Sequence, residues 1–216
     1  MIKQRYFILL ISLNIFSQLL FSQHWIKDTT GIFQLGGAVD IGYSFYVNND
    51  LLYIGGRYIT TGNDTNWSIS AWNGTNWINF GGGMYYGRIC AMKFFNNELY
   101  AGGYFYNAGG VSNTYCLAAW NGSNWHSVGG GINDEVSAFE IYDNKLFMAG
   151  GFSNAGSCTM CQRVVAWDGT NFIDVGDMPT AWGLQVFNNE LYMVGGWGSL
   201  AKYAGGTSWV SVGGST

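Results

Sequence analysis

The chain has 216 residues, of which 48% are hydrophobic and only 10% are charged, and its formal net charge is −4 at pH 7. A single proline, 33 glycines and an aromatic content of 18% are typical of a turn-rich all-β protein and exclude a disordered chain. Nine basic residues against 13 acidic ones, without a basic run, make nucleic acids and acidic membrane surfaces poor partners.

The N-terminus has the pattern of a secretory signal peptide. Lys3 and Arg5 precede a mostly apolar stretch, Tyr6–Phe21, which a small residue follows. Polar residues interrupt the stretch, and it is shorter than the roughly 20 residues of a transmembrane helix. We therefore expect residues 1–22 to be cleaved and residues 23–216 to be secreted or displayed at the cell surface, with no transmembrane segment after cleavage.

The rest of the chain repeats itself about every 47 residues. Strand-like segments end in glycine pairs at Gly55-Gly56, Gly102-Gly103, Gly150-Gly151 and Gly195-Gly196. The phrase Ala-Trp-Asn-Gly-Thr-Asn-Trp recurs, with increasing changes, at residues 71–77, 119–125, 166–172 and 202–209. A period of this length with four short strands per unit is typical of β-propeller blades.

We therefore predict an all-β fold, a β-propeller of four-stranded blades of about 47 residues, with about four to five blades present. The expected units are a half-blade at residues 24–37 and repeats at about 38–83, 84–131, 132–176 and 177–214. These units do not make a whole number of blades. Either the chain is a fragment of a longer propeller with an incomplete ring, or the half-blade caps a four-bladed ring.

The third repeat shows the expected order of strands within one blade. Its strands are predicted at residues 136–142, 145–149, 163–167 and 171–175. Asn-Asn or Asp-Asn pairs join the first strand to the second, and Asx-Gly pairs such as Asp168-Gly169 join the third to the fourth. These residues support the positive φ angles that tight hairpin turns require.

Two aromatic positions recur in the first three repeats and are predicted to fill the core between blades. The first holds Trp72, Trp120 and Trp167, and the second holds Trp77, Trp125 and Phe172. Large flat side chains at equivalent places favour packing between blades over a row of sugar-stacking platforms. The glycine pairs are interpreted as places where neighbouring backbones approach closely or where a strand bends.

The cysteines give no clear metal site. Cys158 and Cys161 form a lone Cys-x-x-Cys within a loop, which in an exported protein favours a local disulfide. Free thiols, or a metal site with two further ligands, are the alternatives. Cys90 and Cys116 fall in predicted strands and are interpreted as small buried hydrophobic residues.

The second repeat carries a family resemblance. Leu-Tyr-Ala-Gly-Gly at 99–103, Ala-Gly-Gly at 108–110, the tryptophan phrase at 118–125 and Val-Gly-Gly-Gly at 128–131 together resemble a secreted kelch-like propeller repeat. Such repeats occur in bacterial surface proteins, many exported by the type IX pathway, and in fungal cortical-marker proteins. The fold group includes the central domain of galactose oxidase. The resemblance covers about residues 30–214 and implies the fold, but propellers host many unrelated activities.

The sequence indicates no catalytic centre, and we expect no metal and no cofactor. A copper site like that of galactose oxidase needs paired histidine and tyrosine ligands, whereas this chain has only His24 and His126, far apart. The one dense acidic spot, Asp134-Glu135, is more often a solvated turn than a calcium contact or part of a glycosidase pair. A carbohydrate-active enzyme that uses Asp134 or Glu140, or its sugar-binding accessory domain, remains an alternative.

The loops predicted on one face of the propeller are rich in aromatic residues. Those residues are Tyr58, Trp67, Tyr85, Tyr86, Tyr104, Phe105, Tyr106 and Trp182. A charge-poor aromatic rim suits recognition of a protein or a glycan, although the same side chains could instead fold over the blade tops. We expect an exported, non-catalytic binding module, and a structural spacer of a larger surface protein is a further alternative.

Overall fold

The computed structural model describes residues 42–57, 59–61, 64–66, 68–178, 181–196 and 199–213. The expected signal peptide at 1–22 and half-blade at 24–37 lie outside the described residues. The boundaries expected for the propeller units therefore stay predictions.

The described chain is an all-β fold in which four antiparallel four-stranded sheets follow one another in sequence. The first sheet contains β1 (Gly42–Asn48), β2 (Leu51–Gly56), β5 (Ile69–Trp72) and β6 (Trp77–Ile78). The second contains β8 (Arg88–Phe95), β9 (Glu98–Tyr104), β11 (Leu117–Trp120) and β12 (Trp125–Ser127). The third contains β13 (Val136–Tyr142), β14 (Lys145–Gly150), β15 (Val164–Trp167) and β16 (Phe172–Asp174). The fourth contains β17 (Gly183–Phe187), β18 (Glu190–Val194), β19 (Leu200–Gly205) and β20 (Ser208–Ser211).

The loops between these strands form two short two-stranded sheets. One pairs β3 (Ile59–Thr61) with β4 (Asp64–Asn66), and the other pairs β7 (Met84–Tyr85) with β10 (Asn107–Ala108). The four strands predicted in the third repeat are confirmed to within one residue at each end.

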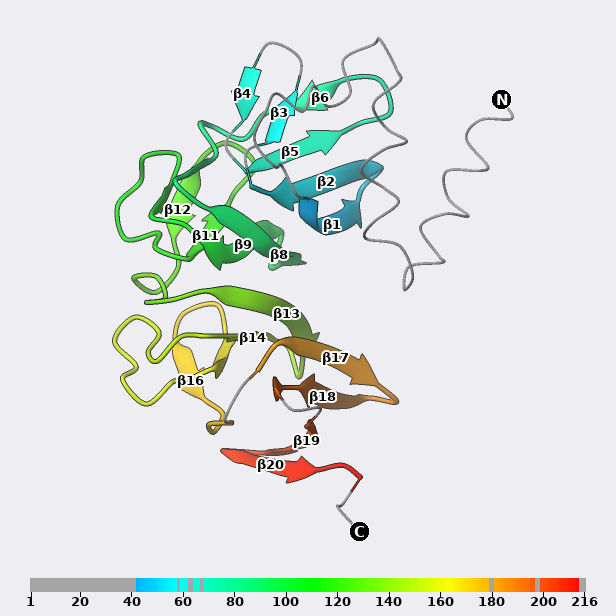
Figure 1. Cartoon of the computed structure of the whole chain (residues 1–216), viewed down its shortest axis with the longest axis vertical. Helices are drawn as coiled ribbons and strands as arrows, with labels where there is room; N and C mark the ends of the chain where they lie inside the picture. The colour runs from blue at the N-terminus through cyan, green and yellow to red at the C-terminus, as the bar shows by residue number, and fades with distance from the viewer. Residues whose placement is uncertain are drawn as a thin grey trace, which may run out of the picture.

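The four sheets are stacked in a row along the long axis of the molecule (Figure 1). Their first strands lie next to one another, because β1 contacts β8, β8 contacts β13 and β13 contacts β17. The first and fourth sheets lie at opposite ends of the row (Figure 1), so the described residues form an open arrangement.

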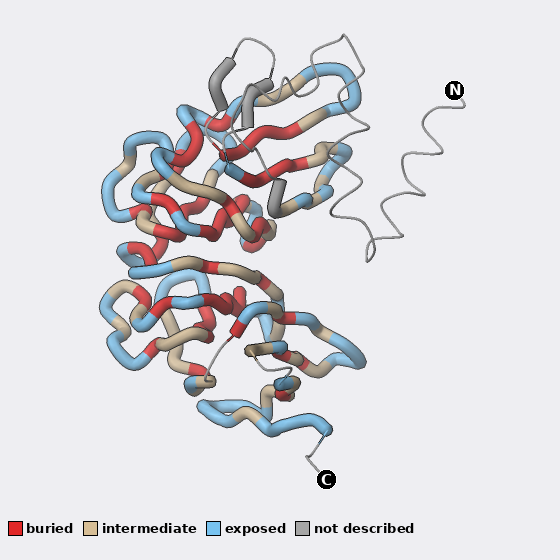
Figure 2. Tube along the Cα trace, viewed as in Figure 1, coloured by how far each residue is buried: buried red, intermediate tan, exposed pale blue. Residues whose placement is uncertain are grey.

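The core consists of three apolar layers between consecutive sheets, where the buried segments of Figure 2 lie. One leucine position illustrates the repeat, because Leu99, Leu146 and Leu191 are all fully buried near the start of the second strand. Each of these leucines belongs to the core that its sheet shares with the preceding sheet.

Tight turns join the first and second strands, as the sequence predicts. The turn residues Asn96 and Asn97 have φ angles of 50° and 65°, and Asn188 and Asn189 have 50° and 60°. Between the third and fourth strands, the Asp168 carboxylate accepts hydrogen bonds from the backbone N–H groups of Thr170 and Asn171, both at 2.7 Å. These hydrogen bonds lower the pKa of Asp168 below its ordinary value, since they stabilise the charged form.

The glycine pair near the end of β9 lies where two other segments approach the strand, whereas the fourth pair, Gly195-Gly196, follows β18, which ends at Val194. A β carbon on Gly102 would lie 2.6 Å from Phe139 of the next sheet, and one on Gly103 would lie 2.0 Å from the carbonyl oxygen of Arg88 in the same sheet. A β-bulge between Ile89 and Ala91 accompanies the second approach, because the extra residue bends the first strand.

The structure corrects the alignment of the third glycine pair. Gly150 pairs with Val136 as Gly103 pairs with Ile89, so Gly150 is the equivalent of Gly103. A β carbon on Gly150 would lie 2.0 Å from the carbonyl oxygen of Glu135, whereas one on Gly151 would meet nothing within 4 Å. Gly151 follows the strand and takes no part in the close approach.

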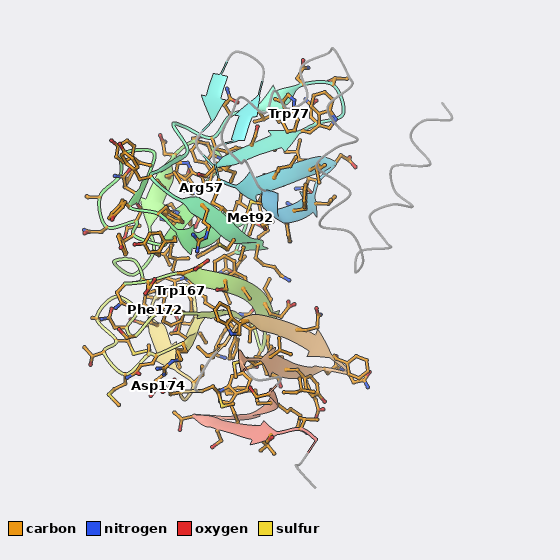
Figure 3. The ribbon with its side chains drawn as sticks, in the orientation of Figure 1. Arg57, Trp77, Met92, Trp167, Phe172 and Asp174 are labelled. Atoms are coloured by element: carbon orange, nitrogen blue, oxygen red, sulfur yellow. A yellow bond between two sulfur atoms is a disulfide. The ribbon has the colours of Figure 1, made fainter. Side chains whose placement is uncertain are left out.

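The recurring aromatic residues pack between sheets. Trp167 lies opposite Phe172 on adjacent strands with ring centroids 4.8 Å apart (Figure 3), and the equivalent pairs in the first two sheets are Trp72 with Trp77 and Trp120 with Trp125. The indole N–H of the buried Trp125 donates to the carbonyl oxygen of Phe80, at the end of the preceding sheet, at 2.9 Å. The aromatic pairs of the second and third sheets therefore pack in the core shared with the preceding sheet.

Two adjacent glycines provide a test of the close approach. We expect Gly150→Ala to lower the free energy of unfolding by about 1–3 kcal/mol, because the methyl group must displace the Glu135 backbone. Gly151→Ala, the matched control, should leave stability unchanged or slightly raised, since alanine restricts the unfolded chain. Urea denaturation of both variants measures the difference, and equal stabilities would contradict the assigned register.

Candidate functional site

The aromatic loops lie at one end of the sheets, opposite the tight turns. In each sheet the first strand begins, and the second strand ends, at this end. The loop before β8 and the loop after β9 are held together here by the short β7–β10 pairing, in which Asn107 lies opposite Tyr85. The backbone N–H of Tyr106 also donates to the carbonyl oxygen of Tyr85 at 3.2 Å.

Five tyrosines from these two loops form a surface that we call the tyrosine patch: Tyr85, Tyr86, Tyr104, Tyr106 and Tyr115. The Tyr85 and Tyr86 rings pack edge to face with centroids 4.4 Å apart. The centre of the Tyr106 ring lies 6.5 Å from the centre of the Tyr104 ring and 5.6 Å from that of the Tyr115 ring, and both pairs pack edge to face. The first four are exposed, so the structure brings four of the predicted aromatic residues together at the surface.

Phe105 is a correction to the predicted site, because its side chain is only 1% exposed and belongs to the core between the first and second sheets. In extended backbone, successive side chains point to opposite sides. Tyr104 and Tyr106 therefore face outward while Phe105 between them faces inward.

The other predicted aromatic residues do not extend the patch. Trp182 is exposed, but it precedes β17 in the fourth sheet, which the third sheet separates from the patch. Tyr58 and Trp67 lie outside the described residues.

An ion pair lies beside the tyrosine patch. Nη2 and Nε of Arg88 donate to the two carboxylate oxygens of Glu135 at 2.8 and 3.3 Å. The Arg88 guanidinium also lies 5.9 Å from the centre of the Tyr104 ring, within the range of a cation–π contact. Arg57, at the end of the first sheet, forms a backbone β-bridge with Arg88. Residues from three sheets therefore meet next to the patch.

Cys90 joins this ion pair and is a second correction. It is the extra residue of the β-bulge in β8 and is only partly buried, whereas Cys116 is buried as predicted. The Cys90 thiol donates to Oε1 of Glu135 at 2.9 Å. Burial, followed by the hydrogen bond and the negative charge of Glu135, raises the pKa of Cys90 to about 12. Cys90 is therefore a protonated hydrogen-bond donor at neutral pH.

Sequence reasoning missed Tyr115, Arg88 and Glu135 as parts of this site. A signal existed for the ion pair, because Arg88 and Glu135 are 47 residues apart, one full repeat. Lys93 and Glu140 have the same spacing and form a second ion pair between β8 and β13 at 2.7 Å. Opposite charges one repeat apart thus mark contacts between the first strands of consecutive sheets.

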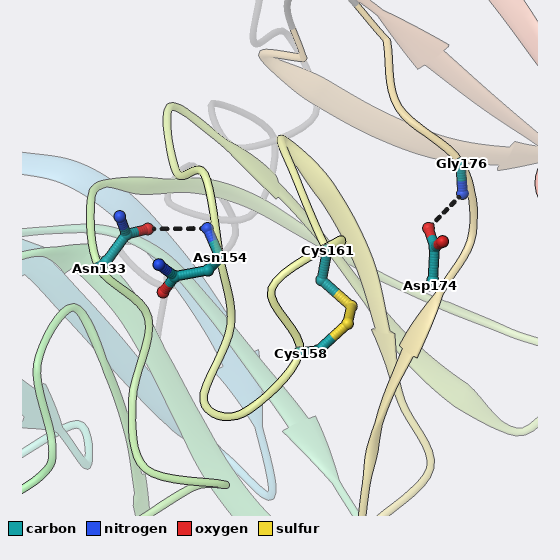
Figure 4. Close-up of a disulfide and its surroundings, with 6 residues drawn as sticks. All are labelled: Asn133, Asn154, Cys158, Cys161, Asp174 and Gly176. Carbon is teal, nitrogen blue, oxygen red and sulfur yellow. Dashed lines mark hydrogen bonds between the residues drawn. A yellow bond between two sulfur atoms is a disulfide. The ribbon is translucent and has the colours of Figure 1, made fainter.

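A disulfide forms within the loop between β14 and β15. Cys158 and Cys161 are joined with an S–S distance of 2.04 Å (Figure 4). The same loop is tied to the one before β13, because the Asn133 side-chain oxygen accepts hydrogen bonds from the backbone N–H groups of Ser153 and Asn154, both at 3.0 Å. Figure 4 also shows the Asp174 carboxylate accepting from the Gly176 N–H at 2.9 Å.

No group of three or more histidine, cysteine, aspartate or glutamate side chains in the described ranges is arranged to hold a metal ion. No helix in the same ranges has the length and apolar character needed to span a bilayer.

Comparison with known proteins identifies a shared fold only. No family model matches the sequence, and no curated protein matches it significantly. Among solved structures, the chain is similar to the extracellular domain of a putative hybrid two-component system from B. thetaiotaomicron, with a TM-score of 0.56 and 13% identity over 84% of this chain. The likeness covers 22% of that protein's chain.

After burial, the Glu135 carboxylate is the next cause that raises the pKa of the Cys90 thiol. We expect Glu135→Gln to lower the pKa of Cys90, because the substitution removes a negative charge and leaves the Arg88 guanidinium beside the sulfur. The thiolate fraction rises about tenfold for each unit by which the pKa falls, so iodoacetamide should alkylate Cys90 faster at pH 8.

Peptide mapping by mass spectrometry measures both free thiols in the same sample. Cys116 is the internal control, because a fully buried thiol reacts only if the variant unfolds. An unchanged or slower rate at Cys90, with Cys116 unreactive, would contradict the assigned hydrogen bond.

Proposed function

We propose that this chain is part of an exported, kelch-like β-propeller that binds a protein or a glycan through the tyrosine patch. The binding is non-catalytic. The observation that carries the proposal is the group of four exposed tyrosines that the backbone holds together at the loop end of the second sheet.

The stacking of the sheets supports the propeller. Blades of a propeller are four-stranded antiparallel sheets around a central axis, and here the first strands of consecutive sheets lie side by side. The two end sheets expose apolar residues at positions that are buried elsewhere. Phe45 is 63% exposed while Met92, at the same register position of the second sheet, is buried. Phe187 is 62% exposed while its equivalent Phe95 is buried. Further blades covering these two faces would complete a ring.

Three observations support export. The first 22 residues have the pattern of a signal peptide, and the similar solved structure is an extracellular domain. The Cys158–Cys161 disulfide belongs to a class of bond that persists mainly in oxidising compartments.

The chemistry of the patch favours recognition. Tyrosine offers a large contact area with few rotatable bonds and a hydroxyl that can donate and accept hydrogen bonds. The adjacent Arg88 and Glu135 charges are already paired with each other, so the surface carries little local net charge. Such a surface suits a partner that supplies flat apolar faces and neutral polar groups, as peptides and sugars do.

The residues considered for a carbohydrate-active enzyme have other partners. The Glu140 carboxylate is bound to Lys93 and also accepts a hydrogen bond from the Ile141 N–H at 2.8 Å. Asp134 lies in the loop before β13 and accepts from the Glu135 N–H at 2.7 Å. The two carboxylates are six positions apart in largely extended chain, a span of roughly 15–20 Å, whereas glycosidase pairs lie about 5–9.5 Å apart.

The double variant Tyr104→Ala/Tyr106→Ala tests the patch. We expect it to weaken binding by about 2 kcal/mol or more, roughly thirtyfold in affinity, since buried aromatic anchors dominate interface energies. A glycan array and a displayed peptide library supply the probes, and the affinity of each hit is then measured by calorimetry. Met160→Ala, which removes an exposed apolar side chain from the β14–β15 loop outside the patch, is the matched control.

Thermal unfolding of both variants shows whether the fold is retained. Equal affinity of the double variant and the parent chain would overturn the proposal. A parent chain that binds neither the glycans nor the peptides would favour the structural spacer.

A further inference from the structure

One type of turn joins the third and fourth strands in each of the first three sheets, at residues 73–76, 121–124 and 168–171. In each turn the backbone N–H of the first residue donates to the carbonyl oxygen of the fourth at 3.2 Å. The second residue is a glycine, with φ angles of 93°, 97° and 102° in the three turns. The backbones therefore match, while the first side chain is a carboxamide in two turns and a carboxylate in the third.

Backbone donors hold the side chain of the first residue in each carboxamide turn. Oδ1 of Asn73 accepts hydrogen bonds from the N–H groups of Thr75 and Asn76 at 2.9 and 2.7 Å. Oδ1 of Asn121 accepts from the equivalent two N–H groups at 3.0 and 2.9 Å. Two donors on one carbonyl oxygen stabilise the negative charge that forms there when a nucleophile attacks the carbonyl carbon.

A backbone nitrogen that can act as this nucleophile follows each carboxamide. It belongs to Gly74 or Gly122, and it reaches Cγ of the preceding asparagine by closing a small ring. Within the described ranges neither glycine N–H donates a hydrogen bond. A β carbon on either glycine would meet nothing within 4 Å, and both turns are exposed. Hydroxide and water can therefore reach the reacting atoms.

The third turn shows that a carboxylate fits where the carboxamide stands. Oδ1 of Asp168 accepts hydrogen bonds from the N–H groups of Asn171 and Thr170, both at 2.7 Å, at the same two positions as in the other turns. These two hydrogen bonds lower the pKa of Asp168, because a charged acceptor forms the stronger bonds. An aspartate formed at residue 73 or 121 would therefore keep the turn.

We propose that Asn73 and Asn121 are sites of spontaneous deamidation, through which the folded protein converts both side chains to aspartate. The Gly74 nitrogen attacks Cγ of Asn73, its proton passes through solvent to the side-chain nitrogen, and the Cγ–N bond breaks to release ammonia. Water then adds across the new bond between Cγ and the Gly74 nitrogen, which restores the N–H and leaves a carboxyl group. No oxidant or cofactor takes part. Gly122 and Asn121 react in the same way.

The turn also selects between the two products of the cyclic imide. Water can add at the backbone carbonyl instead, which gives isoaspartate and inserts an extra carbon into the backbone. Isoaspartate cannot keep the hydrogen bonds of the turn in register, and it can close to the imide again. Aspartate, which the turn stabilises, should therefore accumulate. Each conversion adds one negative charge at the end of the sheets opposite the tyrosine patch, and it does not depend on what the patch binds.

Peptide mapping by mass spectrometry of the folded protein, incubated at pH 8 and 37 °C, measures the conversion of each asparagine. We expect Asn73 and Asn121 to convert, mainly to aspartate, while Asn133 stays intact. Asn133 is the internal control, because its side-chain oxygen also accepts two backbone N–H groups but an aspartate follows it instead of a glycine. The same chain unfolded in urea sets the time scale. If neither site has converted in the folded protein when the unfolded chain is fully converted, the proposal is wrong.

Two variants test the role of the turn itself. Asp168→Asn gives the third turn the same four residues as 73–76, so residue 168 should convert at a rate similar to that of Asn73. Asn73→Asp/Asn121→Asp installs both products and should unfold at the temperature of the parent chain or slightly above it, since the carboxylates form the stronger hydrogen bonds.

The remaining outcomes also decide the proposal. An unreactive residue 168 in Asp168→Asn, beside a reactive Asn73, would contradict the role of the shared turn. Isoaspartate as the main product in the folded protein, in the proportion seen in urea, would contradict the selection of aspartate. A clear loss of stability in Asn73→Asp/Asn121→Asp would show that the turn does not accept the product, and the proposal would fail.

Discussion

The first two sheets each pack closely on the next one where their second strand carries a glycine near its end. A β carbon on Gly55 would lie 2.7 Å from Ile89, and one on Gly102 would lie 2.6 Å from Phe139, so the following sheet occupies the space that a side chain would need. The neighbouring position is equally restricted, since Gly103 faces the Arg88 carbonyl within its own sheet. A β-bulge at that point makes Cys90 the extra residue of the first strand. Arg88, Cys90 and, from the third sheet, Glu135 are in contact beside the tyrosines.

The sequence predicted the parts of the fold that depend on local pattern. Strand limits in the third sheet, the positive φ angles of the Asn-rich turns and the inward place of the paired aromatics follow from alternation, turn chemistry and the 47-residue period. Features that depend on register were harder to predict. Gly150-Gly151 looks like the other glycine pairs, yet only pairing with Val136 shows that Gly150 alone is constrained. Cys90 looks like a core residue until the bulge removes it from the alternation.

For the candidate site too, the sequence predicted the local features, and the three-dimensional arrangement decided the others. Composition identified loops rich in tyrosine, and the structure places four of those tyrosines together at the surface. Composition could not show that Phe105 is buried while Tyr104 and Tyr106 are exposed. The alternation of side chains along the extended chain after β9 decides which ring is buried. The Arg88–Glu135 pair joins residues one repeat apart, so it becomes visible only when consecutive repeats are stacked.

The propeller and the exposed patch can be tested in one experiment, hydroxyl-radical footprinting of the native protein as its cells export it. Phe45 and Phe187 lie on the two end faces and Tyr106 lies in the patch, and all three side chains are exposed in the described chain. If the sheets are blades of a complete ring, oxidation of Phe45 and Phe187 should be strongly suppressed relative to the unfolded protein, while Tyr106 remains reactive. Oxidation of both phenylalanines to the extent seen on unfolding would contradict ring closure and leave an open stack of four sheets.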